Sequence, residues 1–428
     1  MTMKKYIAIL LATVILSFYF FPFQFRFIPS VNSKMALAGI GLPILMLALG
    51  RKNDAAVDNN FFKLSIFAAF VSLIAYISIT VNDTYDFTYV SYIVSMWVWL
   101  CAAYVVVSLI RHIHGYVSVF LLCNYLIALC VSQCVLALTI EFYEPIKQII
   151  YSIIDVDTVN FMEDKRRLMG LGCGLDVAGS RFSAVLVMIS YICINYSNKV
   201  AKYVYLYICS FIIISLIGNM ISRTTTVGMM ISALYFIIAF IFSESANFKK
   251  RFLLWLMVLI VLLVPIIVYT YYNVPDFYRH MRFGFEGFFS LAESGEWDVG
   301  SNEKLKGMYV FPETFKTWLI GDGFFGATTS DPYYIGKEWK SFYMDTDVGY
   351  LRFIFYFGIL GLFTFSYFMY EVAKTCMSKF SCHRLLFELL LVINFIVWFK
   401  VSTDIFLVFA PFLCISKEEN ETFEKTMI

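Results

Sequence analysis

The sequence predicts an all-α membrane protein, a polytopic bundle of about 12 transmembrane helices. Hydrophobic residues make up 60% of its 428 residues and charged residues 15%, whereas soluble domains average about 45–50% and about 25%. Apolar segments of about 20 residues, the length that crosses the hydrocarbon core, recur along the chain. Two long polar stretches interrupt these apolar segments. The sequence contains no internal repeat and no Gly/Ser linker that would mark a domain boundary. We therefore treat residues 1–428 as a single integral membrane domain.

Short polar turns separate most of the apolar segments. In chain order, the candidate spans are 6–22, 33–49, 61–81, 88–110, 115–140, 181–197, 201–221, 224–243, 252–272, 346–370, 384–399 and 401–415. The last two are separated by little more than Lys400. No small-x-small cleavage motif follows the first span, so we expect it to be retained rather than removed as a signal peptide. The polar stretches 141–180 and 273–346 are predicted to be large loops.

The distribution of Lys and Arg predicts the orientation of the chain, because cytoplasmic loops of membrane proteins are enriched in both. With the N-terminus in the cytoplasm, positive residues gather in the short cytoplasmic segments, which carry Lys4, Lys5, Arg51, Lys52, Arg111, Lys199, Lys202, Lys249, Lys250, Arg251, Lys374, Lys379 and Arg384. The short turns on the other side carry only Arg26, Lys34, Arg223 and Lys400. This orientation places both large loops on the outer side and the tail 416–428 in the cytoplasm.

Net charge and cysteine usage exclude several classes of function. A net charge of +2 gives no reason to expect a nucleic-acid partner. Cys173 is the one cysteine in a predicted outer loop, which excludes a disulfide framework within the loops. The spacing of Cys376, Cys382 and His383 is too irregular for a zinc site, and we expect no metal there.

Both large loops contain local helical patterns. In the first loop, apolar residues recur at helical spacing from Glu141 to Ile154, which predicts a helix lying at the membrane surface. In the second loop, helical character resumes from Glu303 to Leu319. An outer segment of this length is more than a connector.

Four arginines at the outer side are candidate anion ligands. Arg181 and Arg223 lie at the outer ends of predicted spans among small polar residues, and Arg279 and Arg282 open the second loop, three residues apart. Arginine near a bilayer is costly unless it faces a polar cavity or an anion. Planar guanidinium groups bind phosphate oxygens bidentately, so such a set suits a pyrophosphate. The alternative is that each arginine reaches lipid phosphate from the interface, and His280 is more often a bystander there than a catalyst.

A pair of carboxylates lies at the mouth of the span that begins near residue 346. Asp345 or Asp347 is suitably placed for a general base, since deprotonating a sugar hydroxyl requires a positioned carboxylate or imidazole. The alternative for both is N-capping of the following helix. Gly358 and Gly361 further along are expected to let a neighbouring helix approach closely.

Four short segments together resemble the bacterial O-antigen polymerases and, more distantly, the O-antigen ligases. The segments are Gly179-Ser180-Arg181-Phe182, Ser222-Arg223-Thr224, Trp318-Leu319-Ile320-Gly321-Asp322-Gly323-Phe324, and Asp347-Val348-Gly349-Tyr350-Leu351 followed by Gly358 and Gly361. With the loops and spans, the resemblance extends from Glu141 to Phe365. The ligases carry a His-Asn pair at the last motif, where this chain has Asp347, and this departure favours a polymerase.

The resemblance implies a glycosyltransferase of the bacterial inner membrane with its active site facing the periplasm. Such polymerases join oligosaccharide repeat units carried on undecaprenyl pyrophosphate into O-antigen or a related surface polysaccharide. They act without a cofactor, and a separate co-polymerase protein is thought to set chain length. The substrates implied are therefore lipid-linked glycans, with membrane lipid around the protein and no nucleic acid.

The implied mechanism assigns roles to the candidate residues. Arg181 and Arg223, with Arg279 and Arg282, hold the pyrophosphate and stabilise the charge that develops on it. Asp347, or failing that Asp345, orients or deprotonates the acceptor hydroxyl. Aromatic residues of the second loop are expected to stack on sugar rings or to anchor the loop at the interface; those proposed to bind glycan are Trp318, Tyr333, Tyr334 and Trp339.

Other classes of protein remain open at this stage. An O-antigen ligase would transfer the finished glycan to lipid A core. A polysaccharide-lipid flippase or other transporter would also have about 12 spans, but inverted repeats and broken helices are its expected marks, and the sequence shows neither. A structural or signalling membrane protein would tolerate substitution of the outer arginines.

Overall fold

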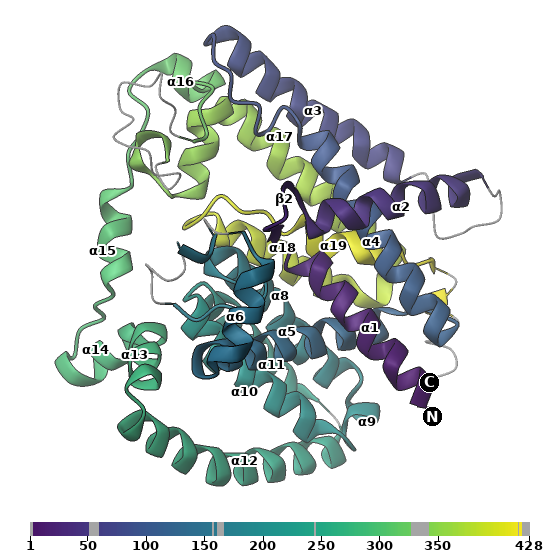
Figure 1. Ribbon diagram of the computed structural model, residues 1–428, viewed down its shortest axis with the longest axis vertical. Coiled ribbons are helices and arrows are strands. Elements are labelled where there is room, and N and C mark those ends of the chain that lie inside the picture. Colours follow the sequence, from purple (N-terminus) through teal and green to yellow (C-terminus); the bar gives the residue numbers. More distant parts are fainter. Residues whose placement is uncertain are drawn as a thin grey trace. The chain divides into compact units, whose positions relative to one another are not determined.

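The computed structural model describes residues 3–50, 60–155, 158–160, 167–243, 245–326, 342–417 and 419–421. Over these ranges the chain is almost entirely α-helical, and the described strands are β1 (Gln24–Phe25) and β2 (Ile28–Asn32), which pair as one antiparallel hairpin (Figure 1). The all-α prediction is confirmed.

A helix occupies each of the predicted spans. They are α1 (Met3–Phe20), α2 (Ser33–Gly50), α3 (Asn60–Val81), α4 (Tyr92–His114), α5 (Val119–Phe142), α8 (Leu175–Asn195), α10 (Val204–Ile221), α11 (Thr225–Phe242), α12 (Ala246–Asn273), α17 (Gly349–Lys379), α18 (Arg384–Val397) and α19 (Phe406–Leu413). Among the described residues, 9 of these helices are long and apolar enough to cross a membrane. The three that fall short are α2, α18 and α19. The chain therefore has the character of a multi-pass membrane protein, while the count of 12 crossings stays a prediction.

Shorter elements fill the two predicted loops and two turns. They are α6 (Glu144–Ile153), α9 (Ser197–Val200), α13 (Pro275–Gly284), α14 (Glu286–Ser294), α15 (Gly300–Gly307), α16 (Phe315–Ile320), and the 3-10 turns η1 (Tyr343–Asp345) and η2 (Ser381–His383). The helix expected over 141–154 is present as α6. The helical character predicted from Glu303 to Leu319 is present at both ends of that stretch, in α15 and α16. The backbone leaves the helix between them, where Pro312 lacks the amide hydrogen that a helix interior requires.

The described chain divides into two compact units. Unit 1 contains residues of the ranges 1–39 and 105–298, and unit 2 contains residues of the ranges 40–104 and 299–421. Each unit therefore combines an early and a late part of the chain.

The centre of unit 1 is α8. In its most apolar 18-residue window, 89% of the residues are buried, against 0% for α12, a long curved helix (Figure 1). Gly228 of α11 lets the two backbones approach, because a Cβ there would overlap Ser183 of α8. The Ser183 hydroxyl donates to the Thr224 carbonyl at 2.9 Å and accepts from the Gly228 amide at 3.0 Å. Small residues with hydroxyl groups are typical of helix contacts in membranes, where close packing replaces the hydrophobic effect.

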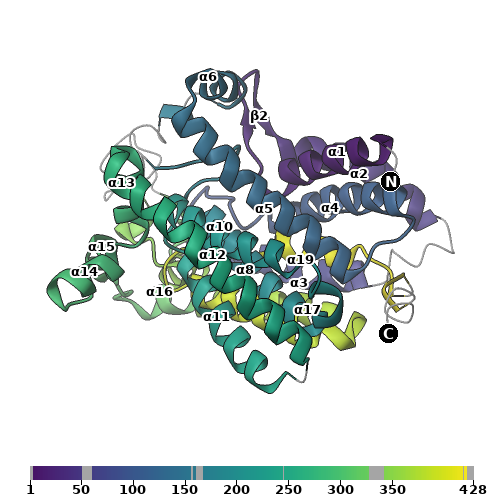
Figure 2. The same ribbon diagram turned by 90° about the horizontal axis from the view of Figure 1, so that it is seen from below.

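The β1–β2 hairpin of unit 1 lies beside α6 (Figure 2). Phe25 forms an antiparallel bridge with Ile154, and the Arg26 amide donates to the Ile153 carbonyl at 2.9 Å. The backbone groups at the end of α6 are thereby satisfied, and the hairpin and the first large loop form one connected structure.

In unit 2, α17 packs against α3, α16 and α18 (Figure 1). The helix is broken at Phe357 and Gly358, where the backbone leaves helical geometry and Gly358 has a φ of +69°. The close approach expected at Gly358 does occur, but its partner is the backbone of Leu319 in the short helix α16 rather than a neighbouring span. At Gly361 a Cβ would meet the ring of Phe357, in the same helix.

Candidate functional site

In unit 1, two arginines share one aromatic ring. The guanidinium carbons of Arg167 and Arg223 lie 4.7 Å and 4.5 Å from the centroid of the Phe283 ring. Arg167 precedes α8, Arg223 lies in the turn between α10 and α11, and Phe283 belongs to α13. Cations over the face of an aromatic ring are attracted by its quadrupole, so Phe283 offsets part of the repulsion between the two guanidinium groups. We call Arg167, Arg223 and Phe283 the arginine cluster.

Two carboxylates lie near the arginine cluster. Glu286 forms an ion pair with Arg223, and its side chain is 41% exposed. Burial lowers the pKa of Arg167; the nearby Asp176 raises it and the charge of Arg223 lowers it further. Among the described residues, no carboxylate oxygen lies within 4 Å of the Arg167 guanidinium. Burial and the charge of Arg223 therefore both act against the charge of Arg167, and Asp176 offsets them in part.

The two arginine-bearing motifs that the sequence singled out are joined at this place. Asp176, in the first turn of α8, accepts hydrogen bonds from Ser222 at 2.9 Å and from Thr224. Gly179 of the first motif leaves no room for a side chain, because a Cβ would lie 2.6 Å from the Ser222 Oγ. The N-terminal end of α8 is thus fastened to the turn that carries Arg223.

Arg181 has different surroundings from Arg223. It is buried in α8, with 5% of its surface exposed, and its guanidinium carbon lies 5.6 Å from the centroid of the Phe21 ring. Its charge acts on the buried thiol of Cys173. The two motifs therefore lie together, but the guanidinium groups of Arg181 and Arg223 contact different rings, Phe21 and Phe283 respectively.

Arg279 and Arg282 lie on α13, as the expected helical spacing requires, and each is paired with a different carboxylate. Arg279 lies 3.3 Å from both Glu141 and Asp276. Arg282 forms a bidentate pair with Glu293. No described hydrogen bond or ion pair joins Arg279 or Arg282 to the arginine cluster.

His280, which the sequence leaves as a bystander, is 2% exposed and its Nε2 lies 2.8 Å from a carboxylate oxygen of Glu141. This contact fastens α13 to the end of α5. The role it supports is structural.

In unit 2, Asp347 lies close to a buried arginine. The Asp347 carboxylate is 3.9 Å from the guanidinium of Arg352, whose side chain is 9% exposed. Arg352 also donates to the Ser402 hydroxyl at 2.6 Å and to the Phe325 carbonyl at 3.0 Å. Its guanidinium carbon lies 3.8 Å from the ring centroid of Phe325. These contacts hold the Arg352 guanidinium in place, so the Asp347 carboxylate lies beside a positive charge of fixed position.

N-capping by Asp345 or Asp347 is contradicted by the structure. The N-cap of α17 is Val348, with no side-chain cap, and Asp347 precedes it. Asp345 is exposed, adopts a left-handed φ of +52° and belongs to η1, three residues before the N-cap of α17. Asp347 is the better placed of the two for a defined polar role.

Among the expected glycan-binding aromatics, Trp318 already has partners within its own segment. Its indole nitrogen donates to the Pro312 carbonyl at 2.9 Å, and its ring stacks on Phe311 at 6.4 Å. The ring is half-buried, so one part of it is still available to a ligand. Tyr333, Tyr334 and Trp339 lie outside the described residues.

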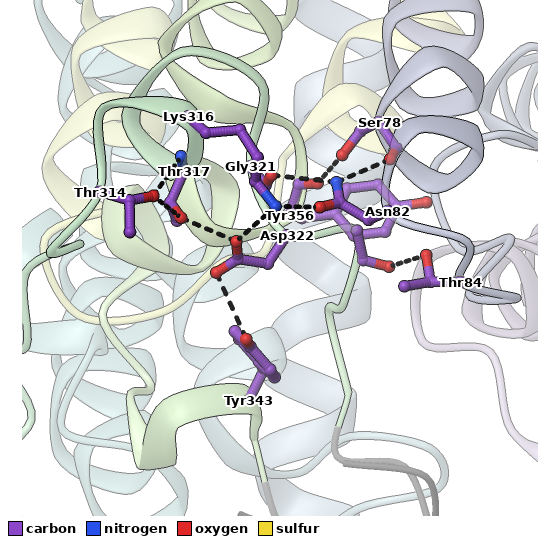
Figure 3. A network of polar contacts seen from close by, with 11 residues as sticks. Ser78, Asn82, Thr84, Thr314, Lys316, Thr317, Gly321, Asp322, Tyr343 and Tyr356 are labelled. Carbon is purple, nitrogen blue, oxygen red and sulfur yellow. Dashed lines mark hydrogen bonds and ion pairs between the residues drawn. The ribbon is translucent and has the colours of Figure 1, made fainter. Parts of the chain in front are cut away.

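Asp322, from the Trp318–Phe324 motif, is the centre of a polar network in unit 2 (Figure 3). Its carboxylate accepts from the Thr317 hydroxyl at 2.7 Å and from the Tyr343 hydroxyl at 3.3 Å, and Lys316 lies 3.7 Å away. Lys316 also donates to Asn82 of α3.

The backbone of the same motif completes the broken helix α17. The amides of Asp322 and Gly323 donate to the carbonyls of Phe355 and Tyr356 at 2.6 Å and 3.1 Å. A break leaves the carbonyls of the preceding turn without their amide donors, and the motif supplies replacement donors. We assign this motif a structural role: it holds the first part of α17, which carries Arg352.

Comparison with protein-family models, curated proteins and solved structures finds no significant match. Function must therefore be argued from the residues themselves. Within the described ranges, no group of three or more His, Cys, Asp and Glu side chains is arranged to hold a metal ion.

Sequence analysis missed three residues that these sites depend on: Arg167, Phe283 and Arg352. Arg167 follows Arg166 in the first large loop, and this doublet was a usable signal of local positive charge. Phe283 gave none, because one phenylalanine among 45 cannot be selected without the fold. Arg352 directly follows the last motif in the sequence but had no partner there to suggest its role.

Proposed function

We propose that this protein is a bacterial inner-membrane glycosyltransferase that polymerises oligosaccharide units carried on a polyprenyl pyrophosphate, at the periplasmic face. The observation that supports the proposal most is the arginine cluster. It places two guanidinium groups over one ring, where they can bind one dianionic group together. The sequence resemblance supplies the expected substrate class.

The chemistry of the arginine cluster suits a pyrophosphate leaving group. As the bond between the anomeric carbon and the lipid pyrophosphate breaks, negative charge accumulates on the phosphate oxygens. Donors fixed in advance stabilise that charge without reorganising, and Phe283 holds both guanidinium groups in place. Arginine is suited to this role because its planar donors match phosphate oxygens bidentately.

The pair between Arg223 and Glu286 does not block such binding. The Arg223 side chain is 17% exposed and that of Glu286 is 41% exposed, and pairs accessible to water contribute only about 0–1 kcal/mol. A phosphate carries more charge than one carboxylate and can replace Glu286 at small cost. Asp176 stays fixed by Ser222 and Thr224, so it continues to hold the surrounding turn.

For the acceptor we propose Asp347 as the residue that orients or deprotonates the attacking hydroxyl. The support lies within unit 2: Asp347 is partly exposed, with 29% of its side chain accessible, and Arg352 defines its position. The role assigned to Arg181 is now limited to supporting the outer end of α8. Arg279 and Arg282 are left as interfacial residues held by their own carboxylates.

Deletion of the gene in its host tests the proposed reaction. We expect surface glycan that carries a single repeat unit, because assembly and transfer of one unit do not require polymerisation. Loss of all surface glycan, including the single-unit form, would instead indicate a flippase or an O-antigen ligase.

The proposed sidedness is tested by thiol labelling in cells with a permeabilised outer membrane. Ser294 at the end of α14 and Cys382 near η2 are both exposed. A membrane-impermeant maleimide should label a Ser294→Cys protein at position 294 and leave Cys382 unmodified until the inner membrane is opened. Labelling of Cys382 first would place the arginine cluster on the wrong face for this function.

A further inference from the structure

Unit 1 contains a cavity that none of the roles above uses. It has a volume of about 290 Å³ and lies between the β1–β2 hairpin, the end of α6 and the loop that precedes α8. Phe23 and Ile154 line its apolar part, and Gln24, Asn32 and Thr158 line its polar part. Binding pockets for small molecules begin at about 300 Å³ and combine an apolar lining with a few polar groups.

The loop that forms one wall of the cavity is rigidly held. Gln133 is buried in α5, accepts from the Leu171 amide at 3.0 Å, donates to the Leu171 carbonyl at 3.2 Å and donates to Ser17 at 2.6 Å. Gly170 and Cys173 close the loop with a hydrogen bond of 2.8 Å from the Gly170 amide to the Cys173 carbonyl. The cavity is thus formed before any ligand binds, which reduces the entropy lost on binding.

Gly172 shows how closely this wall is fitted to α1. It has a φ of +66°, and a Cβ at this position would overlap the carbonyl of Phe21. Only glycine adopts this backbone without strain. The sequence Gly170-Leu171-Gly172-Cys173-Gly174 is therefore required by packing as well as by the cavity.

Two of the polar groups in the cavity, the Gln24 amide and the Thr158 hydroxyl, are uncharged and accessible to a ligand, while Asn32 accepts a hydrogen bond from the Met35 amide at 2.9 Å. Among the described residues, neither the amide of Gln24 nor the hydroxyl of Thr158 makes a hydrogen bond through its side chain. Cys173 is the only titratable residue in the described lining, and burial raises the pKa of its thiol, which therefore stays neutral. Within the described lining a charged ligand would find no opposite charge, whereas a ligand with several hydroxyl groups finds both donors and acceptors.

We infer that this cavity binds a neutral saccharide ring. The amide of Gln24 and the hydroxyl of Thr158 match sugar hydroxyls, and the ring of Phe23 offers an apolar face of the kind on which sugars pack. The choice of a saccharide as the occupant rests on the proposed function. The cavity itself, its rigid wall and the absence of charged side chains from its described lining are independent of that proposal. The site would hold one residue of the glycan at a place distinct from the arginine cluster.

The test measures binding by purified full-length protein in lipid nanodiscs. The probes are the methyl glycosides of glucose, galactose and N-acetylglucosamine, followed by saturation-transfer NMR, and inorganic pyrophosphate, followed by calorimetry. The double variant Gln24→Leu with Thr158→Val removes both polar groups at nearly constant size and breaks no described side-chain hydrogen bond. Ser152→Ala, on the exposed side of α6, is the matched control.

We expect at least one glycoside to bind the parent protein and the Ser152→Ala variant alike, and its Kd to rise about tenfold in the double variant, as the loss of two neutral hydrogen bonds implies. Pyrophosphate should bind all three proteins equally. Absence of binding by every glycoside, or equal binding by the double variant, overturns the inference. Failure of pyrophosphate alone to bind counts against the arginine cluster and leaves the saccharide site standing, so the two proposals fail separately.

Discussion

The guanidinium carbon of Arg223 lies 4.5 Å from the centroid of the Phe283 ring. Arg167 lies over the same ring at 4.7 Å, so a single side chain from α13 holds two cations supplied by separate turns of unit 1. Such contacts are worth about 0.5–2 kcal/mol each. The attraction of the ring for each cation offsets part of the mutual repulsion of the two arginines.

Replacing Arg223 by Lys tests whether planarity matters as well as charge. Lysine keeps the positive charge but loses the bidentate donors and the flat surface that stacks on Phe283. We expect the affinity for inorganic pyrophosphate, measured by calorimetry, to fall at least about tenfold. Arg282→Lys, in a surface pair with Glu293, is the control and should change the affinity less than about twofold. Equal affinities in both variants would show that the arginine cluster acts through charge alone.

Asp347 and Asp345 form a matched pair for testing the acceptor role. Asp347→Asn should abolish chain elongation at normal protein levels, because an amide cannot accept the hydroxyl proton. Asp345→Asn should leave elongation intact, since asparagine tolerates the positive φ of 52° found there. Glycan length on gels is the measurement. Normal chains from the Asp347→Asn protein would remove this residue from the proposed mechanism.

Gly358 is predicted to be a stability determinant rather than a catalytic one. Its φ of +69° and the nearby Leu319 backbone leave no place for a methyl group, and a non-glycine residue in such a conformation costs about 1–3 kcal/mol before steric overlap is added. Gly358→Ala should therefore lower the thermal midpoint of the detergent-solubilised protein by several degrees. For comparison, Gly307→Ala, with open space around its Cβ position, should be neutral; an equal fall in both variants would contradict the role of the helix break.

Thiol reactivity reports on the loop before α8. Burial raises the pKa of Cys173, so its neutral form is favoured in the folded state. The resulting stability is present below the ordinary thiol pKa of about 8.5 and is lost as pH rises beyond it. At pH 8, peptide mapping should find Cys382 alkylated and Cys173 protected until the protein is denatured. Equal alkylation rates at the two positions would mean that this loop opens readily.

The positions of the apolar helices were predictable because a membrane span requires a continuous run of apolar residues, and each predicted run from 6–22 to 401–415 contains a helix. The Gly179–Phe182 and Ser222–Thr224 motifs were singled out separately from the sequence, and only the fold shows that Ser222 and Thr224 donate hydrogen bonds to Asp176 near the first motif. The sequence did not reveal the aromatic ring of the arginine cluster. Phe283 is 60 positions beyond Arg223 in the chain, and only the fold brings its ring to Arg167 and Arg223.

The errors have physical causes as well. Gly358 and Gly361 were expected to let a neighbouring helix approach closely. Gly358 does so, with α16 as the neighbour, whereas the space at Gly361 is occupied by the ring of Phe357 from the same helix, which bends at the positive φ of Gly358. N-capping of α17, the alternative role for Asp345 and Asp347, is excluded because the helix begins after Val348, which makes no side-chain cap. In both cases a local backbone conformation, which sequence pattern does not specify, decided the outcome.

Complementation of the deletion strain by the double variant Arg167→Ala with Arg223→Ala is the most direct test of the arginine cluster. The control is Arg279→Ala with Arg282→Ala, which removes two arginines of the same unit that have their own carboxylate partners. With all proteins present in the membrane at equal amounts, we predict that the control restores long-chain glycan and that the Arg167 and Arg223 variant yields only single units. Long chains of normal length from that variant would contradict the proposal.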